Sequence, residues 1–257
     1  MKAYFLVLCC LAVSHAWTCN EGPRLNYIVQ IDAGQGKVVA RDISNYAYFL
    51  VGSSWSRLGY HKFKHVSVGP AGLWAADTSN RVNKFISGNF RPTTGVTMKQ
   101  VDAGGNGQIV GVASSSYHAY CLRSSLALAY KGTGSLSWYS LSNFMKYISC
   151  GPLYGCWGIH SNSRIYHTQK LTPTTCGNAR WKLIQGAAVM IEVATDGTVF
   201  VLNSAGQVFQ RTGISAKQPA GTRWSNIPMC MPVRSLSYDL GTLWVVTRSR
   251  LLLKCTH

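Results

Sequence analysis

Short runs of alternating apolar and polar residues, separated by turns of small and polar residues, recur along most of the chain. The clearest example is the stretch from Ile148 to Thr168, ISCGPLYGCWGIHSNSRIYHT. It contains an apolar residue, a small-residue turn, a β-rich run, a polar turn and a second β-rich run. Alternation with a period of two residues is typical of half-buried strands, so the stretch predicts two consecutive β-hairpins.

The same layout occurs six times. The related stretches begin at Ile31, Val66, Val101, Ile148, Ile191 and Leu236. An aromatic residue leads a further β-rich run 10 to 12 residues before each of the last five copies: Trp55, Phe90, Trp138, Trp181 and Trp224. Units made only of short strands and repeated every 35 to 47 residues are typical of propeller blades. We therefore predict an all-β fold, a six-bladed β-propeller with three strands from each copy and one aromatic-led strand per blade.

The first residues differ from the repeats. They comprise Lys2, an apolar run from Ala3 to Val13 and the small-x-small sequence Ser14-His15-Ala16. This order is typical of a secretory signal peptide and is too short to span a bilayer. We expect residues 1–16 to be a signal peptide and residues 17–257 to form a single propeller that is secreted and extracellular. No later apolar run approaches the length of a membrane helix, so membrane insertion is not expected.

Positive charge dominates the expected mature chain. Without residues 1–16 it carries 24 basic and 8 acidic residues, a net charge of +16 before histidines. Such a balance favours anionic surfaces, whether lipopolysaccharide, teichoic acid, sulfated glycans or nucleic acid. The basic residues are spread evenly, which indicates a charged folded surface rather than a disordered arm. The alternative is that the charge mainly serves solubility.

Seven cysteines follow residue 16, and cysteine-rich chains are typical of oxidising compartments. Cys150 and Cys156 flank one hairpin turn and are placed to bridge it. A disulfide between Cys19 and Cys255 would lock the first blade to the last. Closing so long a loop stabilises a fold by about 5 kcal/mol at most.

Three cysteines remain, and among them Cys121 with Cys176 is the preferred pair. This pairing leaves Cys230 outside the expected disulfides. No two Cys-x-x-Cys pairs occur with the spacing of zinc ligands, so a metal site is not expected.

No sequence motif indicates catalysis. The chain has no Gly-x-Ser-x-Gly elbow, His-Glu-x-x-His pair, Walker loop or dinucleotide fingerprint. Glycoside hydrolysis usually needs two carboxylates across a cleft, whereas most of the eight acids lie in the repeated turns. Asp32 and Asp102 are interpreted first as turn residues, with calcium binding or catalysis as the alternative. We expect no enzyme, an expectation that two or more acids converging at the centre of the ring would challenge.

Aromatic residues occupy matching positions in four copies: Trp74, Trp157, Phe200 and Trp244. Wedge-shaped blades need bulky apolar residues between them, so we expect these rings to pack in the core, with sugar stacking as the alternative. Four Trp residues lead the fourth strands, and a position at the blade edges remains an alternative for them: Trp55, Trp138, Trp181 and Trp224.

Several stretches resemble tectonin repeats: VSVGPAGLWAADTSNRV, WGIHSNSRIY, VDAGG and the W-x-x-[IL] lead-ins. Across nearly all of residues 17–257 the sequence is similar to the fish-egg lectins, above all in CGPLYGCWGIHSNSRIY, MIEVATDGTVFVLNSAGQVFQRTG and YDLGTLWVV. The resemblance implies a secreted six-bladed tectonin propeller that binds carbohydrate, with N-acetylglucosamine, galactose-type sugars and bacterial surface glycans as ligand classes. It also implies agglutination of microbes, defence of eggs or embryos and, for some members, calcium.

Two features depart from this family pattern. Fish-egg lectins carry an eighth cysteine in the last inner hairpin, where this chain has Thr247. The disulfide that the resemblance implies for Cys230 is therefore in doubt, and two alternatives stay open: an intermolecular disulfide in a homodimer, or Cys230 as a thiol. The strong positive charge is the second departure, and it favours phosphate-bearing or sulfated ligands.

Polar residues lie in or beside the turn between the two middle strands of five copies: Asn45, Asn80, Tyr117, Asn162 and Asn203. Propeller ligands generally use the face formed by these turns and by the linkers between blades. Asn offers a donor and an acceptor to sugar hydroxyls, and the rings of Tyr60 and Tyr139 in the linkers offer stacking. Each Asn is equally well explained as an ordinary turn residue. Repetition favours binding, because weak sites around a ring gain avidity.

The leading hypothesis is a multivalent lectin for microbial or egg-surface glycans, including lipopolysaccharide and peptidoglycan. The alternative is a charge-driven binder of anionic polymers or lipid A phosphates with little sugar specificity. A scaffold for protein partners is a third hypothesis. Nucleic acid is not an expected partner.

Overall fold

The computed structural model describes residues 17–169, 171–177 and 179–257. The expected signal peptide, residues 1–16, lies outside the described residues. Strands dominate the described part, together with one short helix, α1 (Ser124–Ala129), which the sequence pattern does not predict. No helix in this part has the length and apolar character needed to cross a membrane. The prediction of an all-β fold is confirmed.

The described strands form six meanders, each of four antiparallel strands. The first meander consists of β2 (Ile28–Gly34), β3 (Lys37–Asp42), β4 (Tyr46–Val51) and the start of β5 (Ser54–Gly69). The second consists of the rest of β5, β6 (Gly72–Asp77), β7 (Val82–Ile86) and β8 (Asn89–Pro92). The third consists of β9 (Met98–Asp102), β10 (Ile109–Ala113), β11 (His118–Leu122) and the start of β12 (Tyr139–Gly151). The last three consist of the rest of β12, β13 (Gly155–His160), β14 (Arg164–Thr168) and β15 (Lys182–Ala187); β16 (Met190–Val193), β17 (Val199–Leu202), β18 (Val208–Thr212) and β19 (Arg223–Ile227); and β20 (Val233–Asp239), β21 (Thr242–Thr247), β22 (Leu252–Thr256) and β1 (Thr18–Glu21). Because β5 and β12 each pass from one meander into the next, two of the sheets have seven strands.

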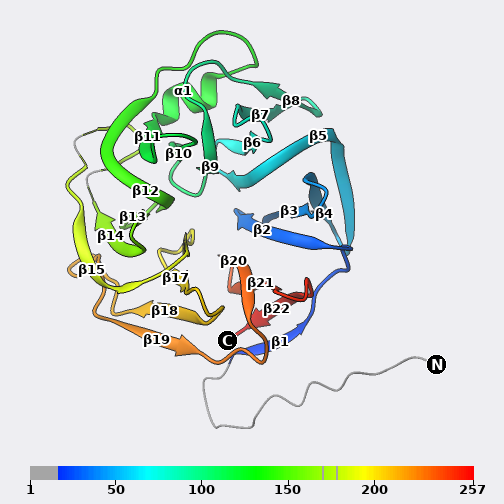
Figure 1. The fold of residues 1–257 in the computed structure, drawn as a ribbon, viewed down its shortest axis with the longest axis vertical. Coiled ribbons are helices and arrows are strands. Elements are labelled where there is room, and N and C mark those ends of the chain that lie inside the picture. The colour runs from blue at the N-terminus through cyan, green and yellow to red at the C-terminus, as the bar shows by residue number, and fades with distance from the viewer. Residues whose placement is uncertain (1–16, 170, 178) are drawn as a thin grey trace.

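The meanders are arranged around a common centre (Figure 1). Their inner strands, β2, β5, β9, β12, β16 and β20, contact one another in that order, and β20 contacts β2. Two serines of β20 join the last meander to the first. The N–H of Ile31 donates to Ser235 Oγ at 3.2 Å, and the N–H of Ala33 donates to Ser237 Oγ at 2.8 Å.

The N-terminal strand β1 completes the sixth meander by pairing with β22. A disulfide joins Cys19 on β1 to Cys255 on β22. Two further disulfides are present: Cys121–Cys176 and Cys150–Cys156. The three pairs are those expected from the sequence, and Cys230 is exposed and lies outside them.

Large apolar side chains fill the space between neighbouring meanders. The aromatic residues predicted to pack there are buried, and all lie on the second strand of a meander: Trp74, Trp157, Phe200 and Trp244. Core packing is therefore confirmed for these positions. Trp55 and Trp224 lie on the outer strands, partly buried, and each donates its Nε1–H to a backbone carbonyl outside its own strand.

Asp32 and Asp102 do not lie in the turns where the sequence analysis placed them. Both belong to inner strands, β2 and β9, and the turn after β2 falls at Gln35 and Gly36. The small residues that follow Asp32 have another cause, namely the close approach of neighbouring inner strands. A Cβ added at Gly34 would lie 2.5 Å from the carbonyl oxygen of Val68 on the next meander.

Candidate functional site

The turns between the second and third strands lie at one end of the inner strands. In five meanders the turn closes on a residue with φ between 59° and 72°: Asn45, Asn80, Tyr117, Ser163 and Arg250. Gly206 takes this place in the remaining meander. Gly and Asn tolerate this left-handed conformation best, so the Asn residues serve the turn in the first instance.

Three of the predicted binding residues, Asn45, Asn80 and Tyr117, therefore occupy equivalent positions. Asn162 precedes the left-handed residue of its turn, and Asn203 opens its turn, where its Oδ1 accepts the N–H of Gln207 at 2.9 Å. The five side chains do not form one repeated set, because equivalence here follows the backbone conformation and not the residue type.

Each of these turns is tied to the next meander. The backbone carbonyls of Asn45, Asn80 and Tyr117 each accept an N–H from the start of the next inner strand, at 2.7 Å. This face of the molecule is therefore built from the middle turns and the entries to the inner strands.

Five of the inner strands contain a β-bulge near their entry. The extra residues are Val29, Lys64, Lys99, Lys146 and Arg234. A bulge leaves its extra residue out of the ladder and redirects its side chain. Four bulges thus present a basic side chain at equivalent places. Sequence analysis missed them, although each basic residue stands two positions before the start of a repeated stretch.

Uncharged groups hold two of these lysines. Lys64 Nζ donates to Asn80 Oδ1 at 2.8 Å, and Lys146 Nζ donates to Ser163 Oγ at 2.6 Å. In both meanders the partner is the left-handed residue of the middle turn. The turn therefore positions the lysine without neutralising it.

The same arrangement continues in two other meanders. Lys99 Nζ lies 3.3 Å from the centroid of the Tyr117 ring. In the first meander, where the bulge residue is Val29, Arg41 of β3 donates from Nη1 to Asn45 Oδ1 at 2.6 Å. The name cation ring is used below for five residues: Arg41, Lys64, Lys99, Lys146 and Arg234.

Like charges lie close together in the cation ring. Burial lowers the pKa of Arg41 to about 10, and the nearby Arg234 contributes to this shift. Burial also lowers the pKa of Lys99, with Lys146 as the second cause. Just inside the ring, burial and then the charge of Arg41 lower the pKa of His65 to about 3, so this imidazole is neutral.

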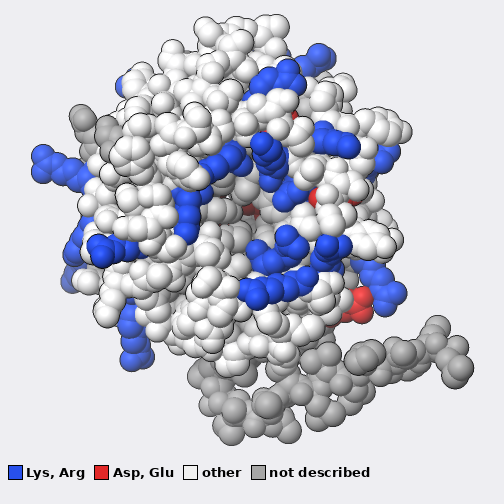
Figure 2. Space-filling view, in the orientation of Figure 1, with Lys and Arg blue, Asp and Glu red and all other residues white. Residues whose placement is uncertain are grey.

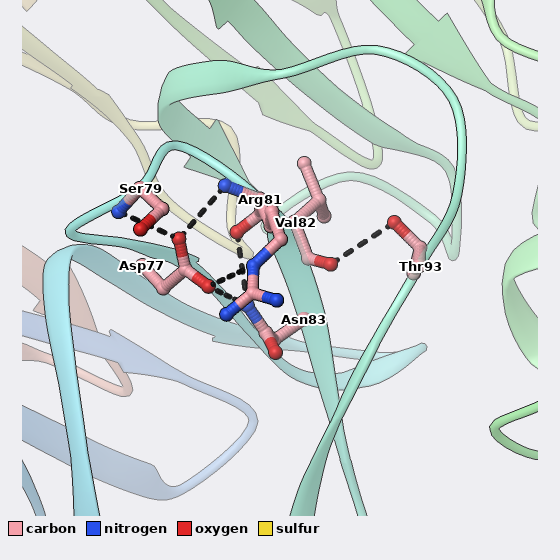
Figure 3. Close-up of polar contacts among 6 residues, drawn as sticks. All are labelled: Asp77, Ser79, Arg81, Val82, Asn83 and Thr93. Atoms are coloured by element: carbon pink, nitrogen blue, oxygen red, sulfur yellow. Dashed lines mark hydrogen bonds and ion pairs between the residues drawn. The ribbon is translucent and has the colours of Figure 1, made fainter.

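Acids near this face are already engaged. The Asp77 carboxylate accepts the backbone N–H groups of Ser79 and Arg81 and the Nε–H of Arg81, at 2.8 to 2.9 Å (Figure 3). Asp42 accepts the N–H of Tyr46 and the hydroxyl of Tyr48, both on the neighbouring strand β4. The cation ring takes part in neither of the two ion pairs found among the described residues. Figure 2 shows lysine and arginine side chains gathered around a central hollow, with acidic atoms deeper inside.

Deeper on the inner strands, acids and serines alternate at one register. The name acid–serine ring is used for these residues: Asp32, Ser67, Asp102, Ser149, Glu192 and Ser237. Two of the acids accept a backbone N–H from the next meander, Asp32 from Val68 at 2.6 Å and Asp102 from Cys150 at 3.0 Å. The three serines do the same at 2.8 to 3.0 Å, and Ser237 also donates to Glu192 at 2.5 Å. These bonds join neighbouring meanders.

The acids of this ring carry raised pKa values. Burial raises the pKa of Asp32 to about 8 and that of Asp102 to about 7. Burial, with the charges of Asp32 and Asp102, raises the pKa of Glu192 well above its usual range. The cavity that these acids line measures about 110 Å³, space for a few water molecules at about 30 Å³ each. The acids converge, but their bonds join the meanders and leave little room for a substrate.

The described residues contain no group of three His, Cys, Asp or Glu side chains arranged to hold a metal ion. A calcium site, which the resemblance implies for some relatives, thus has no obvious set of ligands in this part of the chain. The acids of the acid–serine ring instead bond to backbone and hydroxyl groups.

Surface grooves border the segment that leads into β2. One groove, of about 540 Å³, lies between this segment and the turn from Arg248 to Leu252, and a second, of about 580 Å³, extends towards Trp55. Tyr27 borders both and is 64% exposed. Small-ligand sites typically have volumes of about 300 to 1,000 Å³. Sequence analysis missed Tyr27 because it precedes the first repeated stretch, although its place directly before an inner strand was visible.

The two predicted linker tyrosines lie elsewhere. Tyr60 is 78% exposed, with the guanidinium of Arg57 4.3 Å from its ring centroid. Tyr139 begins β12, and the guanidinium of Arg123 lies 4.5 Å from its ring centroid. Neither borders the two grooves beside Tyr27, so the structure does not gather the predicted residues into one pocket.

Residues 27–248 match the tectonin domain. The chain belongs to the tectonin family. Over 158 residues, this tectonin protein is 38% identical to a fish-egg lectin from Cyprinus carpio. The similarity covers 61% of the chain and spans 65% of the length of that lectin. The resemblance to tectonin-repeat lectins is thereby confirmed.

Solved structures with a similar fold have unrelated roles. Virginiamycin B lyase from Staphylococcus aureus has a TM-score of 0.60 at 12% identity, over 90% of the tectonin chain and 80% of the lyase. The WD40 repeats of RRP9 have a TM-score of 0.61 at 8% identity, over 89% and 79% of the two chains. Prp20p from Saccharomyces cerevisiae has a TM-score of 0.55 at 10% identity, over 89% and 73%. WD40 repeats form propellers, so the neighbours indicate a propeller-like fold and nothing about activity.

Proposed function

We propose that this tectonin protein is a secreted lectin that binds N-acetylglucosamine or galactose-type sugars on microbial or egg-surface glycans. Lipopolysaccharide and peptidoglycan are the proposed targets, and several weak sites agglutinate microbes. The observation that carries the proposal is the tectonin match over residues 27–248, together with 38% identity to a fish-egg lectin. Binding occurs without chemistry, since the buried acids at the centre are bonded to neighbouring meanders.

We also propose that the six meanders are the blades of one propeller, formed by residues 17–257 and closed by β1 and the Cys19–Cys255 disulfide. The order of contacts among the inner strands supports this arrangement, as do the hydrogen bonds from β2 to β20. The proposed extracellular location has support from the signal-like residues 1–16 and from the disulfides, which persist mainly in oxidising compartments.

The proposed sugar contacts lie on the face of the middle turns and linkers. They include six residues expected from the sequence: Asn45, Asn80, Tyr117, Asn162, Asn203 and Tyr60. The seventh, Tyr139, is not kept, because it pairs with Cys121 at the end of β11 that is distant from the middle turn. To these we add the grooves beside Tyr27, where an exposed ring suits the apolar side of a pyranose. Asn26 and Ser249 border the same groove and provide hydrogen-bonding groups for hydroxyls.

The decisive experiment measures binding of the mature chain to lipopolysaccharide at about 0.05 M and about 0.5 M NaCl, with and without free N-acetylglucosamine. A lectin is expected to lose binding to the competitor and to retain most of it at high salt, because stacking and neutral hydrogen bonds are little screened. If binding is lost at high salt and the sugar has no effect, the lectin hypothesis is wrong and the charge-driven alternative is supported.

A substitution tests the groove. Tyr27→Ala is expected to weaken N-acetylglucosamine binding about 5-fold in titration calorimetry, because a stacked aromatic contributes about 1 kcal/mol. Leu153→Ala is the matched control, since Leu153 is 58% exposed in the turn after β12, away from the groove. Unchanged affinity in Tyr27→Ala would exclude the groove and direct attention to Tyr60.

A further inference from the structure

We propose that the cation ring is a binding site for a phosphate or sulfate group carried by an acidic glycan. The glycan part of this proposal rests on the lectin function proposed above, whereas the anion part stands on the ring alone. The site is separate from the groove beside Tyr27, whose lining includes Arg24, Arg248 and Arg250, so one ligand can contact both places.

The positions of the basic residues in the fold support this site. The basic residues come from the first four meanders and the sixth, which contacts the first, and four of them occupy the extra position of a β-bulge. The remaining meander has Val189 at the entry to its inner strand, β16, which has no bulge. Bulges redirect side chains out of the strand alternation, and here they place four basic side chains at one register on the face of the middle turns. A random basic surface would not repeat one register in this way.

The positive charges of the cation ring have few acidic partners. The two acids of the adjoining turns, Asp42 and Asp77, bond to their own turns and to neighbouring strands, and only the charge of Asp42 offsets part of the lowered pKa of Arg41. In the described part of the chain, no ion pair involves the cation ring. Mutual repulsion between Arg41 and Arg234, and between Lys99 and Lys146, is left in the folded protein. A multiply charged anion at the centre would relieve it, since each cation attracts the anion and repels the other cations.

Uncharged partners also hold three of the cationic side chains in place. Asn45 and Asn80 fix Arg41 and Lys64 with amide oxygens, and the Tyr117 ring lies against Lys99. Each partner directs a cation but leaves its charge intact. Side chains held in this way lose less freedom when the ligand arrives, which increases affinity.

The test uses the mature chain and two probes, inorganic pyrophosphate and a heparin-derived hexasaccharide, in titration calorimetry at about 0.05 M NaCl. The triple variant Lys64→Gln, Lys99→Gln, Lys146→Gln removes three charges from the ring. The control variant Lys37→Gln, Lys131→Gln, Lys217→Gln removes three exposed charges elsewhere. We expect the ring variant to bind both probes at least 10-fold more weakly than wild type, and the control less than 3-fold more weakly.

Several results would overturn the proposal. Equal losses in the two variants would mean that the charge acts diffusely, and absence of pyrophosphate binding to the wild type would mean that there is no anion site. Binding of pyrophosphate but not of the hexasaccharide would refute the glycan part. A near-ultraviolet circular dichroism spectrum identical to wild type shows that the ring variant is folded.

Titration with neutral N-acetylglucosamine separates this proposal from the lectin function. Lys64 and Lys99 contact two of the proposed sugar residues, Asn80 and Tyr117, so the ring variant is expected to lose less than about 3-fold in affinity for the neutral sugar, which the groove beside Tyr27 still binds. A wild type that binds the hexasaccharide and not N-acetylglucosamine would refute the proposed lectin specificity and leave the anion site standing.

Discussion

The cation ring and the acid–serine ring lie a few residues apart on largely the same inner strands, yet they treat charge in opposite ways. In the acid–serine ring every acid is buried and bonded, as Asp32 is to the N–H of Val68. In the cation ring Lys64 and Lys146 keep their charges beside uncharged partners. Groups that bond across meanders hold the fold together, whereas groups without an opposite charge remain available for a ligand.

This comparison also separates two ways of reading a perturbed pKa. Burial raises the pKa of Asp102 because the carboxyl is enclosed by the inner strands, and its bonds identify a structural role. The lowered pKa of Lys99 has a neighbouring lysine as its second cause. A shifted pKa thus occurs both at structural sites and at candidate binding sites, and the hydrogen-bonding partners of the group distinguish the two.

The largest expected effect concerns Ser237. Ser237→Ala removes a hydroxyl that accepts the N–H of Ala33 and donates to Glu192, so two buried polar groups lose a partner. We expect the free energy of unfolding to fall by about 3 kcal/mol, as measured by urea denaturation. Ser56→Ala, on an exposed part of β5, should change it by less than about 0.5 kcal/mol. Similar values for both variants would end the structural interpretation of the acid–serine ring.

The second effect is a loss of stability as pH rises. Asp32 and Asp102 have pKa values of about 8 and about 7 in the folded chain, above the unfolded value of about 3.9. Below about pH 4 both states are protonated and nothing is lost; between about pH 4 and 8 only the unfolded state ionises, so unfolding becomes easier. We expect Tm to fall between pH 5 and 8 in scanning calorimetry, most steeply above about pH 6.5, where the opposing titration of His65 in the unfolded state fades.

The double variant Asp32→Asn, Asp102→Asn sharpens this test. Asn keeps an acceptor oxygen but does not ionise, so the decline between pH 5 and 8 should shrink. Asp196→Asn, at an exposed turn, should leave the decline unchanged. A wild-type Tm that rises over this range would mean that these carboxyls are not protonated in the fold.

The smallest expected effect is a gain of stability. Without ligand, the triple variant Lys64→Gln, Lys99→Gln, Lys146→Gln should melt about 1 to 2 °C above wild type at about 0.02 M NaCl, because repulsion within the cation ring is reduced. The difference should vanish at about 0.5 M NaCl, where charges are screened. A lower Tm at both salt concentrations would show that the lysines stabilise the fold and are not held for a ligand.

Much of the fold could be predicted from the sequence because its determinants are local and repeated. The recurring aromatic positions identify the buried rings, such as Trp74 and Trp157. Cys150 and Cys156 flank the turn of a single hairpin, and this spacing predicts their disulfide. Each of these signals lies within one meander, where the alternation of residues reflects burial directly.

The central rings could not be predicted in the same way, because their partners lie on other meanders. Asp32 followed by Ala and Gly is typical of a turn, and the N–H that it accepts belongs to Val68 on the next inner strand. Lys64 occupies an extra residue that interrupts the period of two, so the alternation does not indicate where its side chain points. Sequence-based equivalence also grouped Asn162 with Asn80, although their turns close on different positions.

The pairing of β1 with β22 has a consequence for how the protein is made. Cys19 and Cys255 are separated by 236 residues, so β1 emerges in synthesis long before its partner strand. Contacts this distant along the chain form slowly, and until they form the outer edge of β22 has no partner. The chain is therefore exposed to aggregation until β1 pairs with β22, and chaperones have most to protect before that contact forms.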